Sequence, residues 1–194
     1  MAVIKFLIDS TKLPQGGSSI TAPAAVGHPA FLLNGQLQSN GDYQVPVREG
    51  EEVTIYTLEA NQVTGVKLAP CGIIAHQFGS KPCTVDMMKD PAQRPFNIPE
   101  FDMEFGPQPD FIKYNVNDNP QWQPAPGTWP YWAKNPVISE DVQANLVQTY
   151  VPYASFTVSK LVSGLLNYGL EFAMTKDGKT VQYFYFDPYL LINP

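Results

Sequence analysis

The sequence predicts an all-β fold, an antiparallel β-sandwich of the jelly-roll or immunoglobulin-like kind, in a single domain over residues 1–194. Two observations favour this fold. Short segments in which apolar and polar residues alternate recur along the chain, separated by Gly, Pro, Asn and Asp. The segment from Tyr168 to Tyr189 also has the pattern of two strands joined by a tight turn at Asp177-Gly178.

The C-terminal hairpin is the clearest predicted element. Apolar residues stand at every second position from Tyr168 to Met174, which places one face of this strand in a core. Gly178 tolerates the positive φ that hairpin turns require. The return strand, Val181 to Phe186, is bulky on both faces, which is typical of a central strand, and Asp187-Pro188 ends it.

The same alternation predicts further strands before the hairpin. The first is rich in β-branched residues and is expected to be central, whereas Pro46 assigns its strand to a sheet edge. Gly35 is expected to mark a bulge within one strand, and Pro70 and Gly72 an irregular stretch in another. These strands are predicted at residues 3–9, 30–38, 43–47, 53–60, 63–78 and 151–161.

Residues 81–136 are predicted to form a long, irregular insertion or arm, rich in proline and aromatic residues. The window from Pro91 to Pro136 holds more than half of the nineteen prolines and all three tryptophans. Proline fixes φ and lacks a donor, which disfavours regular structure, while so many aromatic side chains argue against a disordered linker. We expect a short strand at Phe111 and, after the insertion, a short helix from Ser139 to Gln148.

Composition and charge exclude several classes of function. Charged residues make up 15% of the chain and the net charge is −6, so no basic patch is available for nucleic acid. No apolar run reaches the ~18 residues of a membrane span. Asp9 interrupts the N-terminal apolar run, so no signal peptide is expected and the predicted location is cytoplasmic. A weakly charged surface favours self-association, and the predicted partner is a second copy, as a dimer or larger homo-oligomer.

No residue pattern predicts catalysis, a metal or a cofactor. The two histidines are His28 and His76, and no Gly-x-Ser-x-Gly motif is present. His76 is interpreted as a hydrogen-bonded core histidine. Cys71 and Cys83 lack the Cys-x-x-Cys spacing of zinc sites and are interpreted as free, buried thiols.

A sugar-binding site is the alternative that the sequence favours most. The dense run Asn115–Asn119 fits either a turn or a calcium site, with the turn preferred. Lectin-like sandwiches combine such residues with aromatic rings that stack on sugars, so the alternative is a carbohydrate-binding module, calcium-assisted, with glycans as partners. Asp9 and Asp187 close the first and last predicted strands and either cap turns or meet in space. The candidate binding residues are Trp122, Trp129, Tyr131, Trp132, Asp9 and Asp187.

Three stretches resemble the bacterial PixA/AidA inclusion-body protein family. They are the LIDST segment from Leu7 to Thr11, the segment VREGEEVTIY from Val47 to Tyr56, and the C-terminal segment from Ser163 to Pro188. The resemblance covers roughly residues 3–12, 30–75 and 150–192. It implies small cytoplasmic proteins, some deposited as crystalline inclusions and others induced by quorum sensing, with no catalytic residues in the family pattern. The leading expectation is therefore a non-catalytic, self-associating protein.

Overall fold

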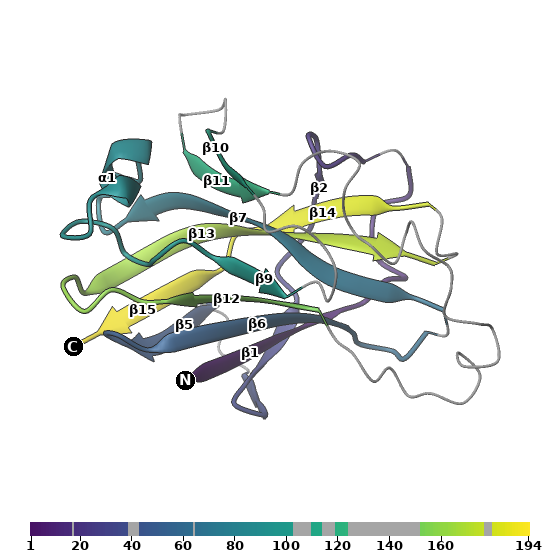
Figure 1. Cartoon of the computed structure of the whole chain (residues 1–194). Helices are drawn as coiled ribbons and strands as arrows, with labels where there is room; N and C mark the ends of the chain where they lie inside the picture. Colours follow the sequence, from purple (N-terminus) through teal and green to yellow (C-terminus); the bar gives the residue numbers. More distant parts are fainter. Residues whose placement is uncertain are drawn as a thin grey trace.

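The computed structural model describes residues 1–16, 18–38, 43–63, 65–102, 110–113, 119–123, 152–176 and 180–194. Within this part of the chain, two β-sheets stack on each other, and a short helix lies at one end of the stack (Figure 1). The all-β sandwich predicted from alternation and turn residues is confirmed.

The first sheet has six strands, and β1 lies inside it between β3 and β6. This confirms the central position predicted for the first strand. The sheet ends at the short strands β4 and β9. In spatial order its strands are β4 (Gln36–Gln38), β3 (Ala30–Leu33), β1 (Ala2–Ile8), β6 (Glu52–Glu59), β12 (Tyr153–Thr157) and β9 (Glu100–Asp102).

The second sheet has nine strands and is built around the two longest ones, β7 and β13. Its main path is β10 (Asp110–Lys113), β11 (Pro120–Gln123), β7 (Lys67–Phe78), β13 (Gly164–Thr175), β14 (Gln182–Phe186) and β2 (Ala24–Ala25). Beside this path lie β15 (Tyr189–Asn193), β5 (Gln44–Arg48) and β8 (Lys81–Pro82), and the helix is α1 (Val85–Lys89).

The core lies between the two sheets and follows the predicted alternation. In β1, every second side chain from Ala2 to Ile8 is buried. Phe6 meets Phe186 of β14 edge-on, with ring centroids 4.8 Å apart, so the rings bridge the layers. Period-two burial of this kind is what fixes the register of each strand.

The sheets are mixed rather than purely antiparallel, which corrects the prediction. Three pairs run parallel: β1 with β6, β15 with β5, and β14 with β2. Between β1 and β6 the chain crosses to the other sheet to form β2 and β5, so β6 returns from the same end as β1. Only a long excursion of this kind allows neighbouring strands to be parallel.

The segment predicted as one strand over residues 30–38 is instead a hairpin of β3 and β4. Its turn is Asn34-Gly35, and both residues have positive φ, 49° and 84°. This is the backbone of a two-residue hairpin loop, for which Asn-Gly is the preferred sequence. Two other predictions are confirmed. The strand that contains Pro46, β5, lies at a sheet edge, and β7 is irregular, with register shifts against β13.

The described parts of residues 81–136 belong to the sandwich. Strand β11 pairs with β7 and β9 pairs with β12, so this segment extends both sheets, and β10 confirms a strand at Phe111. The predicted helix at Ser139–Gln148 and the Asp177-Gly178 turn lie outside the described residues. No helix in the described part of the chain has the length and hydropathy of a membrane span.

Candidate functional site

Three polar side chains from distant segments meet at one end of the long strand β7. His76 lies where the register of β7 shifts against β13. Its Nε2 is 3.1 Å from Asp187 Oδ1, in the link between β14 and β15. Its Nδ1 is 2.8 Å from Asn119 Nδ2, just before β11. The bulge turns the imidazole toward both partners, as strand irregularities commonly do.

These two contacts fix the tautomer of His76. The amide nitrogen of Asn119 donates, so Nδ1 of His76 accepts, and Nε2 carries the hydrogen that it donates to Asp187. Neither ring nitrogen is then free to take a proton from a nucleophile. His76 is hydrogen-bonded, as the sequence indicated. Its side chain is 26% exposed, so it lies at the margin of the core.

Gly169 makes room for this network. A Cβ on Gly169 would lie 2.9 Å from His76 Nε2 and 3.4 Å from Asp187 Oδ1. Real Cβ atoms do not approach another heavy atom as closely as 2.9 Å, so the imidazole would have to shift if any other residue stood here, whereas 3.4 Å to the carboxylate is an ordinary contact. A glycine at this point of β13 therefore lets the network form without a shift of His76.

A second polar pair lies next along the same face of β11 and β13. Gln121 and Glu171 are both buried, and Gln121 Nε2 donates to Glu171 Oε1 at 2.9 Å. A glycine also makes room for Glu171, because a Cβ on Gly72 would collide with its Oε2. A buried carboxylate needs such hydrogen bonds, since it has lost its contact with water.

The two cysteines are free and buried, as predicted. Burial raises the pKa of the Cys83 thiol to about 12. Burial, together with the nearby Glu171 carboxylate, raises the pKa of the Cys71 thiol well above its ordinary value. Both thiols are therefore protonated at neutral pH and poor nucleophiles.

Trp122 is not a sugar-binding residue, which corrects the prediction made for it. It is 1% exposed and packs in the core against Phe96, with ring centroids 5.6 Å apart. In β11 it pairs with Ile73, which is itself buried, so alternation turns the indole inward. A ring inside the core cannot stack on a sugar.

The other predicted binding residues do not converge within the described part of the chain. Asp9 caps the turn after β1: it accepts bonds from the Thr11 hydroxyl and backbone and pairs with Lys12 at 3.0 Å. The Thr11 hydroxyl and Lys12 hold its pKa below its ordinary range. Asp187 instead binds His76. Trp129, Tyr131 and Trp132 lie outside the described residues.

In the run Asn115–Asn119, for which a calcium site was considered, the structure describes only Asn119. Asn119 is buried and binds His76, while residues 115–118 lie outside the described ranges. Over the residues that the structure does describe, no group of three His, Cys, Asp or Glu side chains is placed to hold a metal ion.

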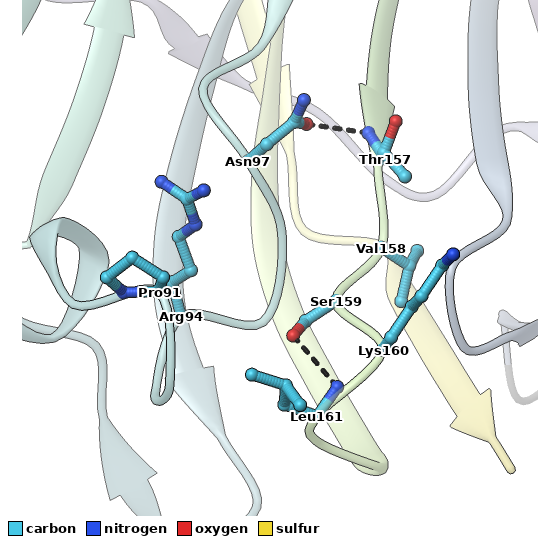
Figure 2. A pocket seen from close by; sticks show the side chains of 8 residues that line it. All are labelled: Pro91, Arg94, Asn97, Thr157, Val158, Ser159, Lys160 and Leu161. Atoms are coloured by element: carbon cyan, nitrogen blue, oxygen red, sulfur yellow. Dashed lines mark hydrogen bonds between the residues drawn. The ribbon is translucent and has the colours of Figure 1, made fainter.

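A pocket of about 400 Å³ lies elsewhere, between the segment after α1 and the end of β12 (Figure 2). It is lined by Pro91, Arg94, Asn97, Thr157, Val158, Ser159, Lys160 and Leu161. No lining residue is acidic. This pocket was not predicted from the sequence, because its walls come from segments about sixty residues apart and contain no motif.

Sequence reasoning also missed Gln121 and Glu171. The signal was present: Glu171 is the one charged residue in the apolar strand from Tyr168 to Met174. A charge inside a strand of this kind is a candidate for a buried, hydrogen-bonded carboxylate.

Comparison with known proteins gives a fold. No family model and no curated protein matches the sequence. Among solved structures, the chain is similar to the inclusion body protein PixA from Burkholderia cenocepacia J2315, with a TM-score of 0.53 and 8% sequence identity. The match covers 99% of this chain and 94% of that chain. The chain therefore has the fold of a PixA inclusion body protein, as the resemblance in its sequence predicted.

Proposed function

We propose that this chain is a non-catalytic, self-associating protein of the inclusion-body type, located in the cytoplasm. The observation that carries the proposal is the likeness to the PixA inclusion body protein, which extends over nearly the full length of both chains. A likeness confined to a common strand core would give far weaker support, because many unrelated proteins share sandwich cores.

The surface chemistry supports self-association. Charged residues make up 15% of the sequence, against about 25% in an average soluble domain. Charge repulsion between copies is correspondingly weak, and little desolvation opposes contact between them. A protein with such a surface assembles more readily as its concentration rises.

Strand β4 offers a specific place for contact between copies. It is the terminal strand of the six-stranded sheet, so no strand from the described residues lies beside its outer backbone groups in that sheet. Its central residue, Leu37, is 64% exposed. Unpaired backbone groups on a sheet edge are a template for strand addition by a second chain, and the exposed apolar side chain of Leu37 adds surface that such a contact would bury.

The geometry of His76 supports the non-catalytic part of the proposal. Both of its ring nitrogens are engaged, by Asp187 and Asn119, in the arrangement of a structural link. The burial of Trp122 argues against the carbohydrate-binding alternative, and no contact between described residues favours that alternative.

The proposal is tested by light scattering coupled to size exclusion over a hundredfold concentration range. Self-association predicts a molar mass that rises with concentration and is unchanged by a calcium chelator or by added sugars. A molar mass of one chain at every concentration would contradict the proposal.

Two matched variants then test the edge strand. Leu37→Lys places a charge on β4, whereas Val63→Lys makes the same change at another exposed apolar residue, outside the strands. If β4 is the contact, Leu37→Lys shifts association to higher concentration and Val63→Lys does not. Equal behaviour of the two variants would place the contact elsewhere on the surface.

A further inference from the structure

The pocket of Figure 2 has rigid walls. One wall follows α1 and carries Arg94 and Asn97, and the other is the end of β12 and the residues after it. Three backbone hydrogen bonds join the walls or brace them: Asn97 N to Thr157 O at 3.0 Å, Ser159 N to Pro95 O at 2.9 Å, and Val158 N to Glu51 O at 2.9 Å. A site held in this way is already formed before a ligand arrives, which lowers the entropic cost of binding.

Two side-chain acceptors in the pocket walls already accept hydrogen bonds from backbone N–H groups. Asn97 Oδ1 accepts the backbone N–H of Thr157 at 2.6 Å, and Ser159 Oγ accepts that of Leu161 at 3.2 Å (Figure 2). The amide group of Asn97 and the hydroxyl hydrogen of Ser159 are then left to donate. The polar groups that remain available to a ligand are therefore mainly donors.

The pocket carries two positive charges, on Arg94 and Lys160. Neither Arg94 nor Lys160 forms an ion pair within the described part of the chain. Asp90, just before the pocket, keeps its negative charge, but its carboxylate accepts from Ala92 N and Gln93 Nε2 and not from the Arg94 guanidinium. Among the described residues, the pocket is thus lined by two cations and by no acidic side chain.

We propose that this pocket binds a small oxyanion, a carboxylate or a phosphate group, with the Arg94 guanidinium as its principal contact. The Asn97 amide, on the same wall as Arg94, donates to the same anion, while Ser159 and Lys160 line the opposite wall (Figure 2). A guanidinium offers paired N–H donors that match the two oxygens of such a group. The volume of about 400 Å³ lies within the range of small-ligand pockets.

The proposal is tested by two-dimensional 1H–15N NMR of the full chain, titrated separately with acetate and with inorganic phosphate. Ionic strength is held constant with sodium chloride, because screening alone shifts exposed signals. We expect saturable shifts of the Arg94 side chain and of the Thr157 and Leu161 amides. The anion that produces them identifies the group that the pocket prefers.

Two variants distinguish the site from general attraction of anions. Arg94→Gln removes the guanidinium and is expected to weaken binding about tenfold, the loss of a charge-assisted hydrogen bond. Lys81→Gln removes the same charge from exposed strand β8, outside the pocket, and should leave the titration unchanged. The spectra without anion report whether each variant is folded. Absence of saturable shifts with both anions, or equal titrations of wild type and Arg94→Gln, would overturn the proposal.

Discussion

His76 Nε2 lies 3.1 Å from Asp187 Oδ1, and this contact joins residues that are 111 positions apart. With Asn119 on the other ring nitrogen, it ties β7, the β14–β15 link and the start of β11 together. The long β7–β13 ladder is thus held at one end by side chains as well as by its backbone.

We expect Asp187→Ala to lower the free energy of unfolding by about 0.5–1.5 kcal/mol, the usual net contribution of one hydrogen bond. Urea denaturation measures this change. In a double-mutant cycle with His76→Ala, the two residues should show a coupling energy of about 0.5–1 kcal/mol. Strictly additive effects would show that the pair contributes nothing to stability.

Gly169→Ala is expected to destabilise the protein by about 1–3 kcal/mol, because its Cβ would lie only 2.9 Å from His76 Nε2 and would displace the ring. Gly27→Ala is the matched control, since a Cβ there meets nothing within 4 Å. Its effect should stay within about 0.5 kcal/mol. Thermal or urea unfolding of both variants provides the comparison. Equal stabilities would show that the space at Gly169 is not needed by His76.

Trp122→Ala is expected to cost about 3–5 kcal/mol of stability, as removal of a large buried aromatic side chain does. Trp122→Phe keeps part of the packing against Phe96 and should cost less. Chemical denaturation followed by circular dichroism measures both. A stable, folded Trp122→Ala variant would contradict the core position of this residue.

Stability should fall in alkaline solution because of Cys83. Its pKa is raised to about 12 by burial, whereas the thiol of an unfolded chain titrates near 8.5. The unfolded chain therefore loses its proton first, so stabilisation is complete below about pH 8.5 and declines as pH rises toward 12.

We expect at least about 1 kcal/mol of loss between pH 8 and pH 10. Cys83→Ala should reduce this slope, and the comparison is made by urea denaturation at both pH values. Cys71 also contributes to the slope in this window, because its pKa is raised as well. An unchanged slope in Cys83→Ala would show that the Cys83 thiol does not titrate as its burial implies.

Thiol reactivity offers an independent check on the same burial. In the folded protein at pH 8, Cys71 and Cys83 should react with an aromatic disulfide reagent far more slowly than in urea. Rapid reaction of either thiol without denaturant would show that it is accessible in the native state.

Local pattern predicted most of the strands correctly, because burial on one face imposes a period of two on the sequence. The strand from Ala2 to Ile8 is a clear instance, whereas every residue from Tyr168 to Met174 is buried, so β13 is covered on both faces. The hairpin at Asn34-Gly35 was also present in the sequence as a known turn signal, and its interpretation as a bulge was an error of reading.

Which strands become neighbours was beyond local pattern. The burial patterns of β1 and β6 are compatible with parallel and with antiparallel pairing, so nothing in their own residues determines the direction. The path of the chain between them, through both sheets, decides it.

The sites divide in the same way. The sequence by itself determined the all-β fold, the weakly charged surface and the burial of both cysteines, because these follow from residue types and their spacing. Only the tertiary structure decided that Trp122 lies inside, that His76 binds Asp187 and Asn119, and that Arg94 and Ser159 line one pocket. Alternation sets which side chains share a face of a strand, but contacts between distant strands exist only once the sheets have formed and packed.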